Sequence, residues 1–203
     1  MNLKNKLQFI SLIIISSVFL SACTKKETET NLDINMTQNI SPSSAEVSTK
    51  AESTIATKTN DTLVAITTKD GQIVLKLYPE EAPNTVANFI KKADSGFYDN
   101  LNFHRVIPGF MAQGGDPLGT GTGGGQIASE INNIPFVRGT IGLARGGDKA
   151  ISNDSQFFIC FDNQGCQHLT GDYVNFGEVV SGLDVLDKIK QGDKIVTITT
   201  KTK

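Results

Sequence analysis

An arginine and a glutamine flank a Pro-Gly turn in this chain, and their types and spacing suit the binding of a peptide. Arg105 lies in an apolar run that precedes the turn, and Gln113 lies in the run that follows it. If both runs are paired strands, alternation places the two side chains on one face. An arginine stays charged when it is partly desolvated and offers several hydrogen-bond donors. The pair is therefore suited to polarise a neutral, partly apolar peptide, and it implies no nucleophile.

Four sequence blocks resemble the signature motifs of the cyclophilins, the peptidyl-prolyl isomerases. They begin at Phe103, Arg138, Ser155 and Leu169, and they read FHRVIPGFMAQGGD, RGTIGLAR, SQFFI and LTGDYVNFG. The blocks stand in the family's order with roughly its spacing, over the chain from about Leu63 to the C-terminus. The resemblance implies a mainly β fold, a closed eight-stranded antiparallel barrel capped by two α-helices. It also implies catalysed rotation about X-Pro peptide bonds, with no cofactor and no covalent intermediate.

The resemblance gives roles to several residues of a candidate site. Arg105 matches the family's catalytic arginine, and Gln113 matches the glutamine that hydrogen-bonds the substrate backbone. Ala144 and Arg145 match a strand-edge pair whose main chain the peptide lies against. The family often has asparagine in place of Arg145. Because only the main chain is used at this position, the difference is compatible with substrate binding.

An apolar pocket for the proline ring is also implied by the resemblance. Its members are Phe110, Met111, Phe158 and Leu169, with Gln156, His168 and Tyr173 at its lining or rim. His168 stands where many members carry tryptophan, and Tyr173 replaces a frequent histidine, so a histidine-based acid-base step is not required. On residue type alone the apolar members would be assigned to the core, so the resemblance decides their role.

The first sixty residues predict a secretory leader and a tether rather than a folded domain. Lys4 and Lys6 precede an apolar run that is too short to span a membrane comfortably, and small residues lead to Cys23. The pattern resembles a bacterial lipoprotein signal, with cleavage before Cys23 and acylation of that residue. The alternative is a plain signal peptide with a chance cysteine. We divide the chain into a signal peptide (1–22), a lipidated tether (23–60) and an isomerase domain (61–203).

Either kind of leader places the mature protein outside the cytoplasm, in the cell envelope. From Thr24 to about Asn60 the chain is rich in polar residues and has no aromatic residue, so it buries too little apolar surface to fold. Thr24 follows the cysteine directly, at the position where an aspartate tends to retain such lipoproteins at an inner membrane. Its presence favours the outer membrane.

Charge and composition exclude several classes of partner. The chain has 19 basic and 21 acidic residues, and removal of a leader with two lysines changes its net charge from −2 to −4. Without a basic cluster, nucleic acid is not expected as a partner. Two histidines without a Cys/His cluster indicate no metal site, and the glycine run from Gly119 to Gly125 lacks the residues of a phosphate-binding loop. We expect proline-containing polypeptides as substrates, a membrane contact through the lipid, and a monomer.

Two cysteines lie in the expected domain. Cys160 and Cys166 would be in a compartment where disulfides form. Cys160 is expected at the end of a strand, and the geometry of the loop after it cannot be derived from the sequence. We predict two free thiols, with a disulfide as the alternative.

The hydrophobic pattern predicts many short strands and two helices. Strands are expected at 63–68, 72–78, 102–107, 110–114, 140–144, 156–161, 173–179 and 194–200, and helices from about 82 to 96 and over 182–190. Asp70-Gly71 predicts a hairpin turn, and Glu80 and Glu81 supply acids where the first helix should begin. This pattern favours a closed barrel or sandwich over a parallel α/β sheet.

Two other functions remain compatible with these features. A peptide-binding holdase would use the same groove with little turnover. A scaffold would dock an envelope partner through the acidic surface. A proline-peptide isomerisation assay separates the enzyme from the holdase. For the scaffold, mutating Arg105 would leave the biological role intact.

Overall fold

The computed structural model describes residues 61–201. The predicted signal peptide, Cys23 and the tether therefore lie outside the described residues. Within 61–201, no helix has the length and apolar character needed to cross a bilayer. The strands are β1 (Thr62–Thr68), β2 (Gly71–Leu77), β3 (Arg105–Ile107), β4 (Met111–Gly114), β5 (Gln126–Ala128), β6 (Thr140–Leu143), β7 (Ile151–Asn153), β8 (Phe157–Cys160), β9 (Asn175–Ser181) and β10 (Thr197–Lys201). The helices are α1 (Pro83–Asp94), α2 (Asn163–Cys166), the 3-10 turn η1 (Gln167–Leu169) and α3 (Leu183–Leu186).

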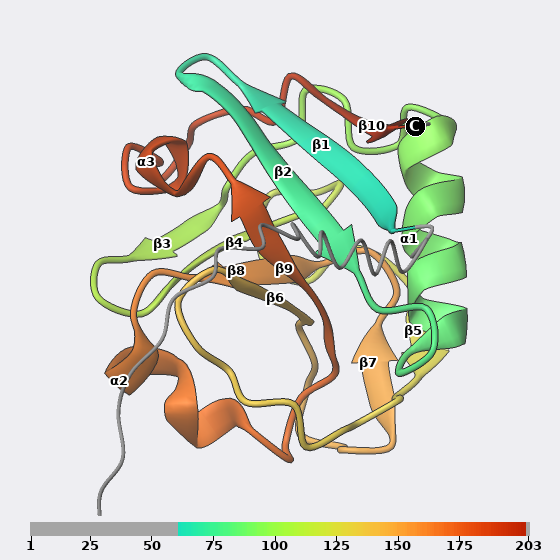
Figure 1. Ribbon diagram of the computed structural model, residues 1–203. Helices are drawn as coiled ribbons and strands as arrows, with labels where there is room; N and C mark the ends of the chain where they lie inside the picture. The colour runs from blue at the N-terminus through green and yellow to red at the C-terminus, as the bar shows by residue number, and fades with distance from the viewer. Residues whose placement is uncertain (1–60, 202–203) are drawn as a thin grey trace, which may run out of the picture. The chain divides into compact units, whose positions relative to one another are not determined.

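Eight strands form one curled antiparallel sheet (Figure 1). Their order across the sheet is β10-β1-β2-β9-β6-β8-β4-β3, and β5 pairs with β7 in a separate two-stranded sheet. The predicted first hairpin is confirmed, because β1 and β2 pair in antiparallel register up to Thr68 and Gly71. The fold is mainly β, as expected.

The predicted closure of the barrel is wrong. Strands β3 and β10 form the two edges of the sheet and do not pair with each other in the described part of the chain. The run expected as one strand over 102–107 contributes only Arg105–Ile107 to the sheet. Its first part instead meets the segment before β10, through an isolated bridge between Asn102 and Lys194. The sheet is therefore an open half-barrel, with irregular backbone pairing where closure was expected.

Strand β8 separates two hydrophobic clusters. Phe157 and Ile159 pack in the main core, whereas Phe158 and Cys160 belong to a second cluster on the opposite face. The alternation of side chains along a strand produces this division. The second cluster, called the pocket cluster below, comprises Met111, Phe136, Phe158, Cys160, Cys166 and Leu169, with Phe110 and Tyr173 packed against it.

Helix α1 packs beside β10 and fills the main core with one face (Figure 1). Its Phe89 ring lies 5.2 Å from the ring of Tyr98 and 5.3 Å from that of Phe176, measured between centroids. The helix begins at Pro83 and has no acidic residue in its first turn, so Glu80 and Glu81 precede it instead of starting it. The predicted helix is confirmed, with its start at the proline of the expected segment and its end just before Gly96.

A carboxylate from a distant loop supports the start of α1. Glu130 accepts hydrogen bonds from the backbone N–H groups of Asn84 and Thr85, at 3.1 and 2.8 Å. The N-cap residue, Ala82, has no side chain that could do so. Partial burial alone would raise the pKa of the Glu130 carboxyl, but these backbone donors outweigh burial and hold the pKa below its usual value.

We expect Glu130→Gln to lower the free energy of unfolding by about 1 kcal/mol at neutral pH, as for loss of other helix-capping interactions. The folded state lowers the pKa of Glu130 below its usual value of 4.5. The carboxylate therefore contributes fully to the free energy of unfolding when the pH is above 4.5, and this contribution is lost as the pH falls through the folded-state pKa. Chemical denaturation at a series of pH values measures this. Glu81→Gln, at an exposed carboxyl next to the same helix, is the matched control. An equal effect of both substitutions would contradict the assignment.

Two helical elements differ from the prediction. The second helix, expected over 182–190, is the single turn α3, Leu183–Leu186. Helix α2 was not expected, because its four residues carry no hydrophobic periodicity. Asp162 caps it by accepting hydrogen bonds from the backbone N–H groups of Gln164 and Gly165, at 2.8 and 3.3 Å. The α2 turn determines the position of Cys166, which bears on the site described next.

Candidate active site

Arg105 and Gln113 face each other across the β3-β4 hairpin. They are direct partners in the antiparallel register, as are Ile107 and Met111. Nη1 of Arg105 donates a hydrogen bond to Oε1 of Gln113 at 3.3 Å and lies 3.9 Å from the sulfur of Met111. The guanidinium carbon is 5.9 Å from the centroid of the Phe110 ring. The hairpin therefore gathers a cation, an amide and two apolar side chains at one place.

A pocket of about 120 Å³ opens at this pair. Its lining residues are Arg105, Phe110, Met111, Gln113, Ala144, Arg145, Phe158, Leu169 and Tyr173. Its apolar floor is well packed, because Met111, Phe158 and Leu169 are each at most 5% exposed. The structure thus brings nine of the eleven predicted site residues together around one cavity, and it leaves Gln156 and His168 outside the lining.

Gln156 lies behind Gln113 and is only 2% exposed. Its Oε1 accepts a hydrogen bond from Nε2 of Gln113 at 3.0 Å, and its Nε2 donates to the carbonyl oxygen of Gly123 at 2.8 Å. The Gln113 amide is therefore bonded at both ends, to Arg105 through its oxygen and to Gln156 through its nitrogen. This arrangement keeps the oxygen of Gln113 on the side of Arg105.

The glycine loop that receives Gln156 is itself held in place. Asp116, which is 1% exposed, accepts a hydrogen bond from the backbone N–H of Thr120 at 2.9 Å. Burial alone would raise the pKa of the Asp116 carboxyl, but this and other backbone N–H groups of the loop keep the pKa below its usual value. From the opposite side, Nδ2 of Asn153 donates to the Gly123 carbonyl oxygen at 2.9 Å.

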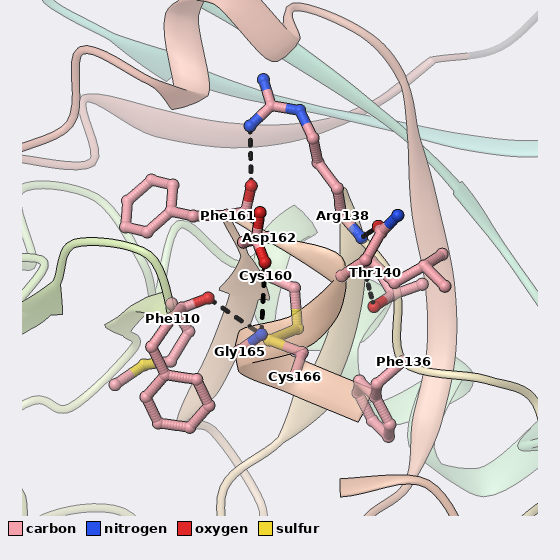
Figure 2. Close-up of a disulfide and its surroundings, with 12 residues drawn as sticks. Phe110, Phe136, Arg138, Thr140, Cys160, Phe161, Asp162, Gly165 and Cys166 are labelled. Carbon is pink, nitrogen blue, oxygen red and sulfur yellow. Dashed lines mark hydrogen bonds between the residues drawn. A yellow bond between two sulfur atoms is a disulfide. The ribbon is translucent and has the colours of Figure 1, made fainter. Parts of the chain in front are cut away.

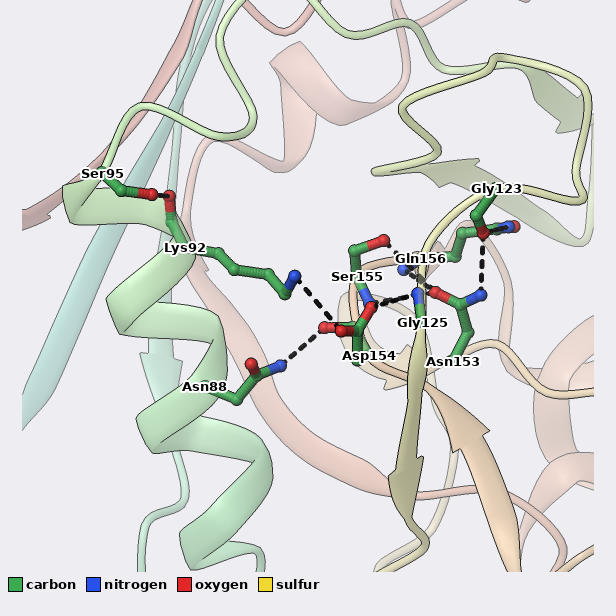
Figure 3. Close-up of polar contacts among 9 residues, drawn as sticks. All are labelled: Asn88, Lys92, Ser95, Gly123, Gly125, Asn153, Asp154, Ser155 and Gln156. Carbon is green, nitrogen blue, oxygen red and sulfur yellow. Dashed lines mark hydrogen bonds and ion pairs between the residues drawn. The ribbon is translucent and has the colours of Figure 1, made fainter.

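The residue after Asn153 joins this loop to α1 (Figure 3). The Asp154 carboxylate accepts a hydrogen bond from the backbone N–H of Gly125 at 2.7 Å and pairs with Nζ of Lys92 at 3.3 Å. The backbone carbonyl of Asp154 accepts from Nδ2 of Asn88 at 2.6 Å. The glycine run is therefore a structural loop that supports the position of Gln156.

The floor of the pocket depends on a glycine. The rings of Phe136 and Phe158 stack at 5.4 Å between centroids, directly beside Gly142 of β6. A Cβ atom at Gly142 would lie 2.6 Å from Phe158 and 2.7 Å from Phe136. Since real Cβ contacts are not that short, only glycine allows the two rings to pack here.

The predicted free thiols are wrong, because Cys160 and Cys166 form a disulfide (Figure 2). The α2 turn reverses the chain after β8, and it brings the two Cα atoms to 6.1 Å, within the range that a disulfide requires. Both cysteines are fully buried in the pocket cluster. Sγ of Cys166 also lies 3.3 Å from the backbone carbonyl oxygen of Phe110. The bridge therefore ties the segment that leads to Leu169 onto the strand that carries Phe158.

Arg145 lines the side of the pocket formed by β6 and the loop before β9. Its Nε donates to the backbone carbonyl of Asp172 at 2.8 Å, and its Nη1 donates to that of Gly146 at 2.8 Å. The guanidinium carbon lies 4.5 Å from the centroid of the Tyr173 ring, and that ring meets Phe158 edge to face at 5.7 Å. The side chain is thus held against the pocket floor through Tyr173.

Neither histidine of the chain lines the pocket. His168 is exposed, and its ring packs against Phe110 at 5.6 Å between centroids, so it borders the pocket from outside. His104 has both ring nitrogens buried, and this burial lowers its pKa. The pocket therefore offers donors and apolar surface, with no histidine positioned for proton transfer.

Residues 63–202 match the family model described as cyclophilin type peptidyl-prolyl cis-trans isomerase/CLD. A peptidyl-prolyl cis-trans isomerase of Synechococcus elongatus is 45% identical over 145 residues, which cover 70% of this chain and 97% of the relative. The chain belongs to the cyclophilin-type peptidyl-prolyl isomerases. It is an enzyme of that class.

Other cyclophilin relatives support the same conclusion. A peptidyl-prolyl cis-trans isomerase of Helicobacter pylori is 48% identical over 139 residues, covering 66% of this chain and 83% of the relative. Among solved structures, a cyclophilin-type isomerase of Cryptosporidium parvum, determined in the presence of the dipeptide Ala-Pro, is similar with a TM-score of 0.64 at 31% identity. That comparison covers 70% of this chain and 99% of the other.

Several residues that shape this cyclophilin pocket escaped the sequence reasoning. Phe136 stacks on the floor and Asp172 holds Arg145, yet both come from irregular segments without a periodic signal. The sequence did carry a signal for the disulfide, because two cysteines lie six positions apart in a protein expected in an oxidising compartment. Within residues 61–201, no group of three or more His, Cys, Asp or Glu residues is placed to hold a metal ion.

Proposed function

We propose that this cyclophilin is a lipid-anchored enzyme of the cell envelope, which isomerises X-Pro bonds in unfolded or flexible extracytoplasmic proteins and so assists their folding. Uncatalysed rotation about the peptide bond has a barrier of about 18–20 kcal/mol, and X-Pro isomers exchange over tens to hundreds of seconds. That slow exchange is a rate-limiting step for chains that must fold after export. The activity class follows from the family, whereas the location and the folding role are part of the proposal.

Arg105 is the proposed catalytic residue. In the twisted transition state the prolyl nitrogen loses conjugation and gains a localised lone pair. A donor aimed at that nitrogen stabilises the twisted form more than either planar ground state. The Arg105 guanidinium, positioned by Gln113 at the edge of the pocket, is such a donor. No covalent step and no cofactor are part of this mechanism.

The remaining pocket residues are proposed to hold the substrate. The apolar floor of Met111, Phe158 and Leu169, with the Phe110 ring beside it, suits the pyrrolidine ring. Gln113 and the main chain at Ala144 and Arg145 would fix the flanking peptide. The observation that carries the proposal is the juxtaposition of an arginine with this apolar floor.

An assay for proline isomerisation tests the proposal. The full chain, in a mild nonionic detergent, is added to Ala-Ala-Pro-Phe peptides, and cis-trans exchange is followed by NMR, which needs no coupling protease. We expect exchange to become fast at substoichiometric enzyme. Peptide binding without accelerated exchange would instead indicate a holdase.

The proposed anchor gives a separate prediction about location. In cells, we expect the full chain to partition into the detergent phase and Cys23→Ser to remain unlipidated and to lose this partitioning. A chain that begins at Asp61 should retain isomerase activity, because the family match begins at residue 63. Phase partitioning and the exchange assay measure the two effects. Wild-type protein found only in the aqueous phase would contradict the anchor, and loss of folding in the shortened chain would show that the tether belongs to the domain.

A further inference from the structure

Two of the three arginines of an acidic domain line the pocket, and no acidic residue lies beside them in its lining. Between residues 61 and 201 the chain has 12 basic and 16 acidic residues, a net charge of −4. Its three arginines are Arg105, Arg138 and Arg145. Arg105 and Arg145 line the same pocket, and no acidic residue is among the residues that line it. The pocket therefore presents two permanent cations to whatever enters.

Neither pocket arginine is neutralised by a direct ion pair within residues 61–201. Arg138, by contrast, pairs with both carboxylate oxygens of Asp187 at 2.9 Å. Asp172 is the acidic residue that contacts Arg145, but its carboxylate binds Nζ of Lys149. Only the backbone carbonyl of Asp172 bonds to Arg145. The pKa of the Asp172 carboxyl is lowered mainly by Lys149 and in part by Arg145, so this carboxylate offsets some of the Arg145 charge from a distance. Because it does not pair directly with the guanidinium, Arg145 can still pair with a ligand.

Arg145 is also held in a defined position. Two backbone carbonyls accept from its Nε and Nη1, and the guanidinium lies against the Tyr173 ring. These contacts leave Nη2 without a hydrogen-bond acceptor in the described part of the chain. A guanidinium that is already ordered loses little further entropy when it binds a carboxylate, and its planar donors match that group.

We infer that Arg145 makes this isomerase selective for peptides with an acidic side chain next to the isomerised proline. The inference rests on the proposed function of the pocket. With a proline ring on the floor of Met111, Phe158 and Leu169, one flanking residue passes over Ala144 and Arg145. The floor and Arg145 line one cavity of about 120 Å³, and neighbouring Cα atoms of a peptide are about 3.8 Å apart, so a glutamate or aspartate directly beside the proline would lie near this guanidinium. A lysine at the same position would meet two like charges.

Peptides that differ at one residue test the inference. The full chain in detergent is assayed by NMR exchange on blocked tetrapeptides with Glu, Gln or Lys placed before the proline, and on a second set with these residues after it. We expect kcat/KM for the Glu peptide to exceed that for the Gln peptide by about threefold to fivefold in one of the two sets. This ratio corresponds to the free energy that one exposed ion pair contributes. The ratio should fall toward one in 1 M salt.

Variants assign the effect to Arg145. Arg145→Met should bring the Glu/Gln ratio close to one, whereas Arg145→Lys should retain most of it. Comparing ratios within each variant removes any change in overall activity. Lys91→Met, which removes one exposed charge from α1, is the matched control and should leave the ratio unchanged.

The outcomes also separate this inference from the proposed function. Equal turnover of all peptides by the wild type, or a ratio that survives Arg145→Met, would overturn the inference while leaving the isomerase intact. Absence of turnover on every peptide would instead contradict the proposed function itself.

Discussion

Arg105→Ala is expected to reduce kcat/KM for proline isomerisation by about 10²–10³, the usual effect of removing one donor from an electrostatic catalytic site. The effect should fall mainly on kcat, because the arginine acts on the twisted state. Its side chain is exposed and outside both hydrophobic clusters, so the thermal midpoint should change little. NMR exchange and calorimetry on the same preparation measure both quantities.

Arg138→Ala is the matched control for this prediction. It removes the arginine that does not line the pocket, together with its exposed pair with Asp187 and its hydrogen bond to the backbone carbonyl of Phe161 at 2.7 Å. We expect near-normal turnover from it. The proposed role of Arg105 fails if the folded Arg105→Ala enzyme keeps more than half of the wild-type rate.

Reduction of the Cys160–Cys166 disulfide is expected to lower the free energy of unfolding by about 2 kcal/mol, from the loop-entropy relation for a bridge this short in sequence. For a domain of this size that corresponds to a decrease in Tm of roughly 5–10 °C. The bridge connects the strand of Phe158 to the segment that leads to Leu169. We therefore also expect KM for proline peptides to rise on reduction.

The double variant Cys160→Ala, Cys166→Ala provides the control for this experiment. A reductant should leave its Tm and KM unchanged, which separates loss of the bridge from other effects of the reagent. Appearance of two titratable thiols in the wild type without a change in Tm would contradict the structural role of the bridge.

Local sequence features predicted the hairpin at the centre of the site. A Pro-Gly turn between two short apolar runs is enough to pair Arg105 with Gln113, because the turn sets the register. The assignment of Phe110, Met111 and Phe158 to the pocket could not be derived from local sequence features. Strand β8 is buried on both faces, so its composition cannot distinguish a pocket residue from a core residue. Only the family resemblance separated them.

Features that depend on distant contacts were beyond the sequence reasoning. The cap of α1 comes from Glu130, 45 positions after Thr85, and nothing local to the helix indicates it. The disulfide depends on the α2 turn, whose polar residues carry no pattern. The open sheet results from a strand that contributes only Arg105–Ile107, because the residues before it pair with another segment.

The division of β8 between two clusters has a consequence for how this enzyme can change. Phe157 and Ile159 stabilise the scaffold, while Phe158, their neighbour along the same strand, shapes only the pocket cluster. Residues of the main core and residues of the pocket cluster therefore alternate along this strand. A substitution at Phe158 can therefore change the pocket surface and leave the main-core contacts of Phe157 and Ile159 in place, while Cys160, on the same side as Phe158, holds the pocket segment to the strand through its disulfide.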